Sequence, residues 1–266
     1  MSNNYLDDAE TVAHYTKLEH VADILYDKRL LLSPVKNLAD PREIPENWII
    51  TGGIGELHKA SQLLAERILS DAKHQIRLLC TLRDEKKHEH DSDMKSVIED
   101  ASYSRPRMWA QYGDKSKGFC VVLDRKLLDN EVNEVVQKTE HMLSEKVTYP
   151  SHLGKGGGVE IEHGPDHDPT VPDIFETLNK NNNLDSIYFR KARDWEHEYE
   201  HRWLLYDPKL EPIYVPIGGE GVVKAVVLGC NFPCNQISQV QLYCKDLNCR
   251  LFGLVYTHPE YKLTDL

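Results

Sequence analysis

The chain is short of cysteine and contains no long apolar run. Its 266 residues include six cysteines, and Cys80 and Cys120 lie within apolar segments, where a reduced thiol packs as a small hydrophobe. No stretch approaches the roughly 18 apolar residues that a membrane helix requires, and the first residues lack a basic region followed by an apolar one. We therefore expect reduced thiols, a cytoplasmic location and no membrane partner.

Basic residues are also in deficit, and several common site motifs are absent. The 32 lysines and arginines against 43 acidic residues give a net charge of -11, which repels nucleic-acid backbone and anionic lipid at long range. The glycines at 154–158 lack the spacing of a phosphate-binding loop, and no G-x-S-x-G marks a serine hydrolase. The last four cysteines lack the paired C-x-x-C spacing of structural zinc. We expect no metal and no general binding of nucleic acid.

Apolar periodicity predicts an α+β fold. Helical spacing of apolar residues appears at 17–26, 55–73 and 237–247. Short β-rich apolar runs predict buried strands at 76–82, 119–123, 222–229 and 251–256. Polar or glycine-rich composition predicts surface loops at 83–104 and 151–170. Without repeats, linkers or steady βαβ alternation, we expect one domain over residues 1–266, with a mixed or antiparallel core sheet flanked by helices.

Residues 195–203, WEHEYEHRW, are the strongest chemical signal. If they are extended, period-two alternation gathers charged side chains on one face and aromatic ones on the other. The charged set is Glu196, Glu198, Glu200 and Arg202. Crowded carboxylates repel one another and raise their pKa values unless cations or donors compensate, so this grouping favours a functional site. The competing interpretation is a solvent-facing strand whose charges extend into water.

Two other segments carry rings near predicted strands. Trp109 and Tyr112 precede the strand at 119–123, and their rings either form a flat wall for a planar ligand or pack in the core. His14, Tyr15 and Thr16 stand at a predicted strand-to-helix junction, where side chains often face a cleft. We expect a polar and aromatic cleft drawn from these segments and from residues 198–202.

In this order the motifs resemble a bacterial family, domain of unknown function 2971. The resemblance rests on His14-Tyr15-Thr16, on 108–112 with Gly118-Phe119-Cys120, and on Lys191 with Trp195-x-x-Glu198-x-Glu200-x-Arg202. It covers residues from about 13 to 256. Two departures are that Leu38 and Ala39 interrupt the family's Asn-Asp-Pro, and that the strand after Arg77 ends Cys-Thr-Leu instead of Cys-Phe-Ser.

The layout is more distantly similar to that of ADP-ribosyltransferases, which bind NAD and transfer its ADP-ribose. This similarity implies a split sheet and NAD as the substrate. By this similarity, His14, with Tyr15 and Thr16, would bind the nicotinamide-side ribose, and Tyr112 or Trp109 would contact the nicotinamide ring. It makes Glu200 the catalytic carboxylate and Glu198 its upstream partner. Arg202 either binds diphosphate or neutralises one of these glutamates.

Three functions follow as hypotheses. The first is an ADP-ribosyltransferase-like, NAD-consuming enzyme, a transferase or glycohydrolase, that acts as a toxin or antiphage effector on an unidentified macromolecular acceptor. The second is a noncatalytic interaction module that senses a nucleotide or a peptide. The third is a metal-dependent nuclease using Asp194, Glu198 and Glu200, which the acidic composition disfavours.

Overall fold

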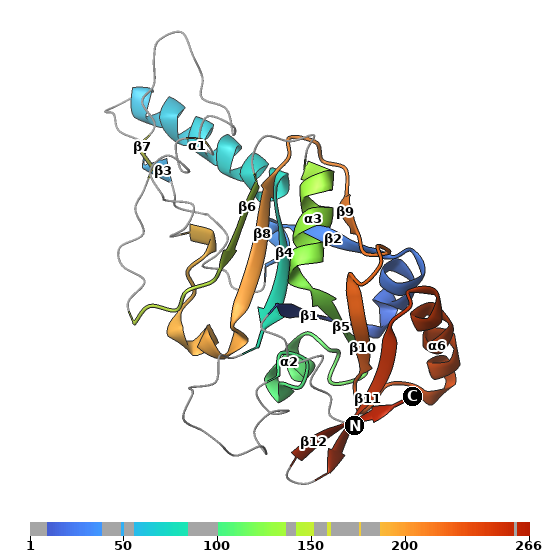
Figure 1. Cartoon of the computed structure of the whole chain (residues 1–266). Helices are drawn as coiled ribbons and strands as arrows, with labels where there is room; N and C mark the ends of the chain where they lie inside the picture. The colour runs from blue at the N-terminus through green and yellow to red at the C-terminus, as the bar shows by residue number, and fades with distance from the viewer. Residues whose placement is uncertain are drawn as a thin grey trace.

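A ten-stranded sheet forms the centre of the computed structural model (Figure 1), which describes residues 10–38, 49–50, 56–84, 101–136, 142–151, 159–160, 176, 187–257 and 260–266. The strands follow the order β12-β11-β10-β5-β1-β4-β2-β9, and β8 pairs with both β4 and β6. Among the described strands of this sheet, only β10 and β11 pair in parallel. The strands are β1 (Thr11–Thr16), β2 (Arg29–Pro34), β4 (Ile76–Arg83), β5 (Phe119–Asp124), β6 (Met142–Lys146), β8 (Glu200–Tyr206), β9 (Ile213–Pro216), β10 (Val223–Leu228), β11 (Arg250–Thr257) and β12 (Glu260–Asp265).

The expected α+β fold with a mixed, mostly antiparallel sheet is therefore confirmed, whereas the split sheet of ADP-ribosyltransferases is not. The four predicted strands correspond to β4, β5, β10 and β11, and two predicted helices correspond to α1 and α6. The α-helices are α1 (Glu56–Gln75), α2 (Pro106–Gln111), α3 (Arg125–Val136) and α6 (Ile237–Asp246). A second, two-stranded sheet pairs β3 (Ile49–Ile50) with β7 (Val159–Glu160), and β7 falls within a predicted loop.

The predicted helix at 17–26 is not a single α-helix. A 3-10 turn, η1 (Leu18–His20), is followed by a π-helical turn, η2 (Ala22–Tyr26). Thr16, just before these turns, is still in β1, opposite Phe119 of β5. The 3-10 turn and the π-helical turn together connect β1 to β2.

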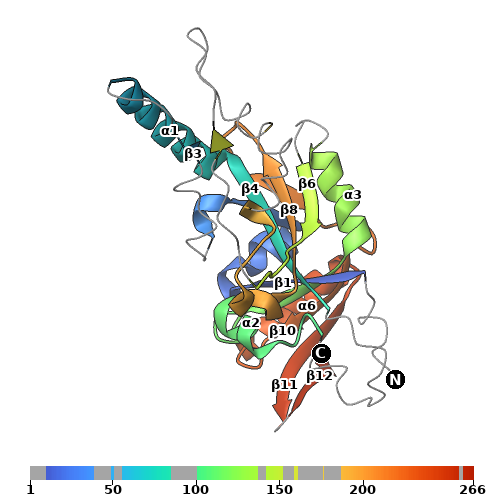
Figure 2. The same cartoon turned by 90° about the vertical axis from the view of Figure 1, so that its left-hand side faces the viewer.

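Different helices cover the two faces of the sheet (Figure 2). On one face α3 and α6 contribute Leu128 and Val240 to the core, together with η2. On the other face α2 contributes Trp109, and α1 contributes Ile68. The end of the loop predicted at 83–104 is also buried here, since 101–104 are inaccessible to solvent, while 85–100 and most of 151–170 lie outside the described residues. No helix among the described residues is long and apolar enough to cross a membrane.

The sheet divides at β4. One edge of this strand pairs with β1 at Leu82 and Arg83 and with β2 at Arg77 and Leu78. The stretch 79–81 therefore lies in a fork between β1 and β2. The opposite edge pairs with β8 along its whole length, so side chains of β8 reach the fork from across one strand.

Candidate functional site

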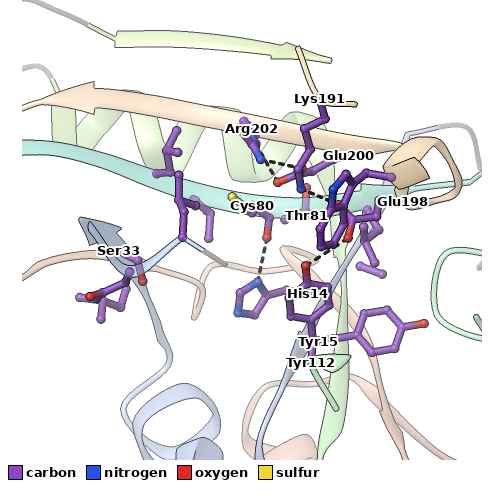
Figure 3. A pocket seen from close by; sticks show the side chains of 18 residues that line it. His14, Tyr15, Ser33, Cys80, Thr81, Tyr112, Lys191, Glu198, Glu200 and Arg202 are labelled. Carbon is purple, nitrogen blue, oxygen red and sulfur yellow. Dashed lines mark hydrogen bonds and ion pairs between the residues drawn. The ribbon is translucent and has the colours of Figure 1, made fainter. Parts of the chain in front are cut away.

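A cavity of about 250 Å³ lies at this fork (Figure 3). Segments far apart in the chain supply its lining: β1 supplies His14, the end of α2 supplies Tyr112, and the turn before β8 supplies Glu198. Glu200 and Arg202 reach it from β8. The structure thus brings together side chains that the sequence separates by more than a hundred positions. The interpretation of 195–203 as a solvent-facing strand is wrong, because 193–198 form a 3-10 helix and all of β8 is buried.

His14 presents a hydrogen-bond acceptor to this cavity. Its Nδ1 lies 3.0 Å from the carbonyl oxygen of Cys80 in the fork. A carbonyl oxygen can only accept, so Nδ1 carries the proton. Burial lowers the pKa of His14, so the ring is neutral and its Nε2 keeps a free lone pair. The Cys80 carbonyl oxygen is available to His14 because β1 and β4 separate at the fork. A continuous β1–β4 ladder would use this oxygen in a backbone hydrogen bond.

The path of the chain before β8 differs from the predicted strand. Residues 193–198 form a 3-10 helix, η5 (Arg193–Glu198), and Tyr199 then takes a left-handed conformation with φ 47° and ψ 46°. A non-glycine residue in this region is strained by about 1 kcal/mol or more. The reversal aims Glu198 and Glu200, on either side of Tyr199, at the same cation. Glu196 points away, with a side chain 38% exposed.

Arg105, just before α2, holds this strained turn. Its guanidinium donates to the carbonyl oxygens of His197 and Glu198 at 3.0 and 2.8 Å and to that of Arg83 at 2.7 Å. The same group lies 4.7 Å above the ring of Tyr199. Three charge-assisted bonds to backbone of about 1.5–3 kcal/mol each exceed the cost of the left-handed residue. Arg105 therefore joins the segment that carries Tyr112 to the segment that carries both glutamates.

The two glutamates belong to a buried ionic network. Lys191 Nζ lies 2.7 Å from Glu198 Oε2 and 3.1 Å from Glu200 Oε2. Arg202 donates hydrogen bonds to both oxygens of Glu200, through Nε at 2.7 Å and Nη2 at 2.9 Å. Its Nη1 donates to the Tyr188 carbonyl oxygen at 2.6 Å. Two cations balance two carboxylates, so the network carries no net charge. Of the two roles considered for Arg202, the structure shows the neutralising one.

The network fixes the ionisation of the groups around it. Burial alone would raise the pKa of Glu200, but the charges of Arg202 and Lys191 outweigh it and lower the pKa to about 2. Tyr112 donates to Glu198 Oε1 at 3.1 Å. Burial and the charge of Glu198 raise the pKa of Tyr112, so its hydroxyl stays protonated. At neutral pH Glu200 is therefore an ionised carboxylate, beside a neutral phenol at Tyr112 and a neutral imidazole at His14.

Some predicted binding residues belong to the core instead. Trp109 is 1% exposed and donates through Nε1 to the Tyr103 carbonyl, so it does not line the cavity. Thr16 lies in the β1–β5 ladder and does not line it either. Tyr15 borders the cavity, but its hydroxyl donates to Ser102 at 2.7 Å on the opposite side of the strand. His14 and Tyr15 are neighbours in β1 and therefore face opposite ways.

Lys191 and Trp195 line the cavity although neither was given a role in the predicted site. Lys191 formed part of the family pattern without a role, because a lone lysine gives no spacing signal, yet it bridges both glutamates. Trp195 lines the cavity and lies 4.8 Å from Lys191 Nζ. Asp194 is exposed and does not line the cavity, so the three acids of the nuclease hypothesis do not meet. The described part of the chain contains no group of three His, Cys, Asp or Glu residues that could hold a metal ion.

Comparison with known proteins gives one family. Residues 108–203 match the family described as protein of unknown function (DUF2971), which is the family that the motifs predicted, over a shorter stretch than the expected 13–256. The matched segment begins in α2 and ends in β8, and so contains Tyr112, Lys191 and both glutamates. No curated protein and no solved structure matches the chain.

Proposed function

We propose that this member of the DUF2971 family consumes NAD by cleaving the bond between nicotinamide and ribose. One observation carries the proposal: a single cavity in which a neutral imidazole, His14, and a carboxylate, Glu198, both present acceptors, with the Tyr112 hydroxyl beside them. Sugar hydroxyls are hydrogen-bond donors, and a ribose diol matches such a pair of acceptors.

Glu198 is the better placed of the two carboxylates to contact the sugar. Its oxygens each accept one bond, from Tyr112 and from Lys191. Glu200 accepts three bonds, two of them from the bidentate Arg202. Because a carboxylate offers about four acceptor positions, Glu198 retains more capacity for a ligand. Glu200 then acts as a positioning residue that holds Lys191, and through it Glu198.

The chemistry that this arrangement supports is glycosidic cleavage. The electron pair of the C–N bond passes to the pyridinium nitrogen, so the base leaves as neutral nicotinamide. Positive charge develops on the ribose, and the nearby Glu198 carboxylate stabilises it electrostatically. Water or an acceptor hydroxyl then adds to the sugar carbon and gives its proton to Glu198. With water the products are ADP-ribose, nicotinamide and a proton.

Nicotinamide release from NAD by the purified chain tests the proposal. Glu198→Gln keeps the shape of the side chain but removes the charge, and we expect turnover to fall roughly 100-fold or more, the scale typical of one electrostatic group. Glu196→Gln is the matched control, since Glu196 is two positions away and pairs with Arg193 at the surface. We expect it to stay within about twofold of the native rate. Absence of release by the native chain, or equal rates for native and Glu198→Gln proteins, rejects the proposal.

A noncatalytic module that binds a nucleoside is the second candidate. The observation that favours it is that both glutamates are already ion-paired, which suits a rigid binding site as well as a reactive one. Isothermal titration with NAD separates the two. Saturable binding without any nicotinamide release supports the module, and release that depends on Glu198 supports the enzyme.

A further inference from the structure

The cavity is small for a dinucleotide. Its volume of about 250 Å³ lies below the roughly 300–1,000 Å³ of pockets that enclose drug-sized ligands. NAD is larger than most such ligands. The described lining therefore encloses one nucleoside half of it and leaves the other half outside.

The charges that line the cavity are poorly suited to a diphosphate. Among the described residues that line it, Lys191 is the only lysine and Arg202 is the only arginine. Lys191 is paired with Glu198 and Glu200, and Arg202 with Glu200, at 2.7–3.1 Å. A phosphate entering here would compete with two buried carboxylates for these cations and meet their negative charge. A neutral sugar avoids that repulsion.

The other end of the cavity is apolar. Figure 3 shows Ser33 on the far side of His14 from Glu198. Other lining residues adjoin Ser33 in the fold: Leu31 lies in the same strand, Leu78 pairs with Ser33 from β4, and Asn37 and Leu38 follow shortly after β2. Leucine side chains can cover a flat ring, and a hydroxyl and a carboxamide can hydrogen-bond an amide substituent on it. An apolar lining also favours loss of the positive charge of a pyridinium ring as the base departs.

We propose that the substrate class of this site is the nicotinamide nucleoside: the enclosed half of NAD supplies recognition, and the diphosphate and adenosine lie outside. This inference rests on the proposed function. It makes nicotinamide riboside, which has no phosphate, a substrate in its own right. Water adds at the sugar carbon, the C–N bond breaks, and nicotinamide, ribose and a proton are released.

The test compares kcat/KM for nicotinamide release from NAD and from nicotinamide riboside with the native chain. We expect the two values to agree within about tenfold. A preference for NAD of more than tenfold overturns the inference while leaving the proposed function standing. Release from neither compound rejects the proposed function, and this inference with it.

A double variant checks whether surface cations bind the diphosphate. Lys36 and Arg107 are exposed cations next to the lining: Lys36 adjoins Asn37 in sequence, and Arg107 lies 5.0 Å from the ring of Trp195. Neither lines the cavity. We expect Lys36→Gln with Arg107→Gln to leave the NAD to nicotinamide riboside ratio unchanged within about twofold. A selective loss of activity on NAD, with the nucleoside unaffected, contradicts the inference.

Discussion

Replacing each glutamate of the network by glutamine separates the one that stabilises the fold from the one that acts on a ligand. In Glu200→Gln, the buried guanidinium of Arg202 keeps one amide oxygen as an acceptor but loses the negative charge and one of the two oxygens that lie 2.7 and 2.9 Å away in the native protein. Removing one partner of a buried ion pair costs about 3–5 kcal/mol, because the other charge is left uncompensated. In Glu198→Gln, Lys191 keeps Glu200 at 3.1 Å and the new amide oxygen still accepts one bond. Losing one charge-assisted bond costs about 1.5–3 kcal/mol.

Urea denaturation measures this difference in the free energy of unfolding. The comparison requires that the free energy depends on urea concentration with the same slope in each variant. For a protein of this size 1 kcal/mol corresponds to roughly 2–4 °C in melting temperature, so we expect Glu200→Gln to melt about 10 °C lower than the native chain. Glu198→Gln should be the more stable of the two variants and the less active in nicotinamide release. The partly exposed Glu196→Gln should stay within about 0.5 kcal/mol of native. Equal destabilisation by the two buried substitutions, or a larger effect for Glu198→Gln, would refute the division of roles.

Three other predictions concern stability. Gly118→Ala should cost roughly 2 kcal/mol or more in urea denaturation, because its Cβ would lie 2.1 Å from the Thr16 carbonyl oxygen; a native-like midpoint would contradict this. Burial, and then the positive charges of neighbouring arginines, lower the pKa of His201 from 6.5 to about 4. As pH falls from about 6.5 to 4, the unfolded chain therefore protonates this histidine before the folded chain does, and up to about 3 kcal/mol of stability is lost over that range. If the stability of a His201→Gln variant depends on pH in the same way as that of the native chain, this histidine is not the cause. Arg105→Lys should cost roughly 3 kcal/mol, because a lysine cannot reproduce the three carbonyl bonds, and should also slow nicotinamide release; stability and activity both near native would contradict its positioning role.

The strands and long helices could be read from the sequence because their signals are local. The run at 119–123 is apolar at every position, and the run at 76–82 is apolar except at Arg77 and Thr81. Both are buried from both sides, in β5 and β4. α6 keeps Val240 and Cys244 on its buried face, as its spacing predicted. Period and composition decide such elements before any tertiary contact forms.

The turn before β8 could not be predicted in the same way. Residues 195–203 alternate perfectly in sequence, which favours a strand through Glu198. A bond network from Arg105, 92 and 93 positions earlier, overrides this preference and stabilises the left-handed Tyr199. The grouping of Glu198 with Glu200 was anticipated, but the backbone that produces it was not.

Burial was the other point that composition could not settle. Trp109 and Tyr112 are equal candidates in the sequence, but three positions along a short helix place one in the core and the other at the cavity. Lys191 gave no signal of its own, because its importance comes from two carboxylates that only the folded chain brings to it. Residues whose role depends on distant partners need coordinates to be identified.

A crystal structure of the Glu198→Gln chain with nicotinamide riboside tests most directly whether this cavity holds a ribose. We expect ribose hydroxyls within about 3.2 Å of His14 Nε2 and of the residue 198 amide oxygen, with the nicotinamide ring near Ser33 and Asn37. A nucleoside bound elsewhere, or one whose sugar lies away from both groups while the cavity contains only solvent, would contradict it.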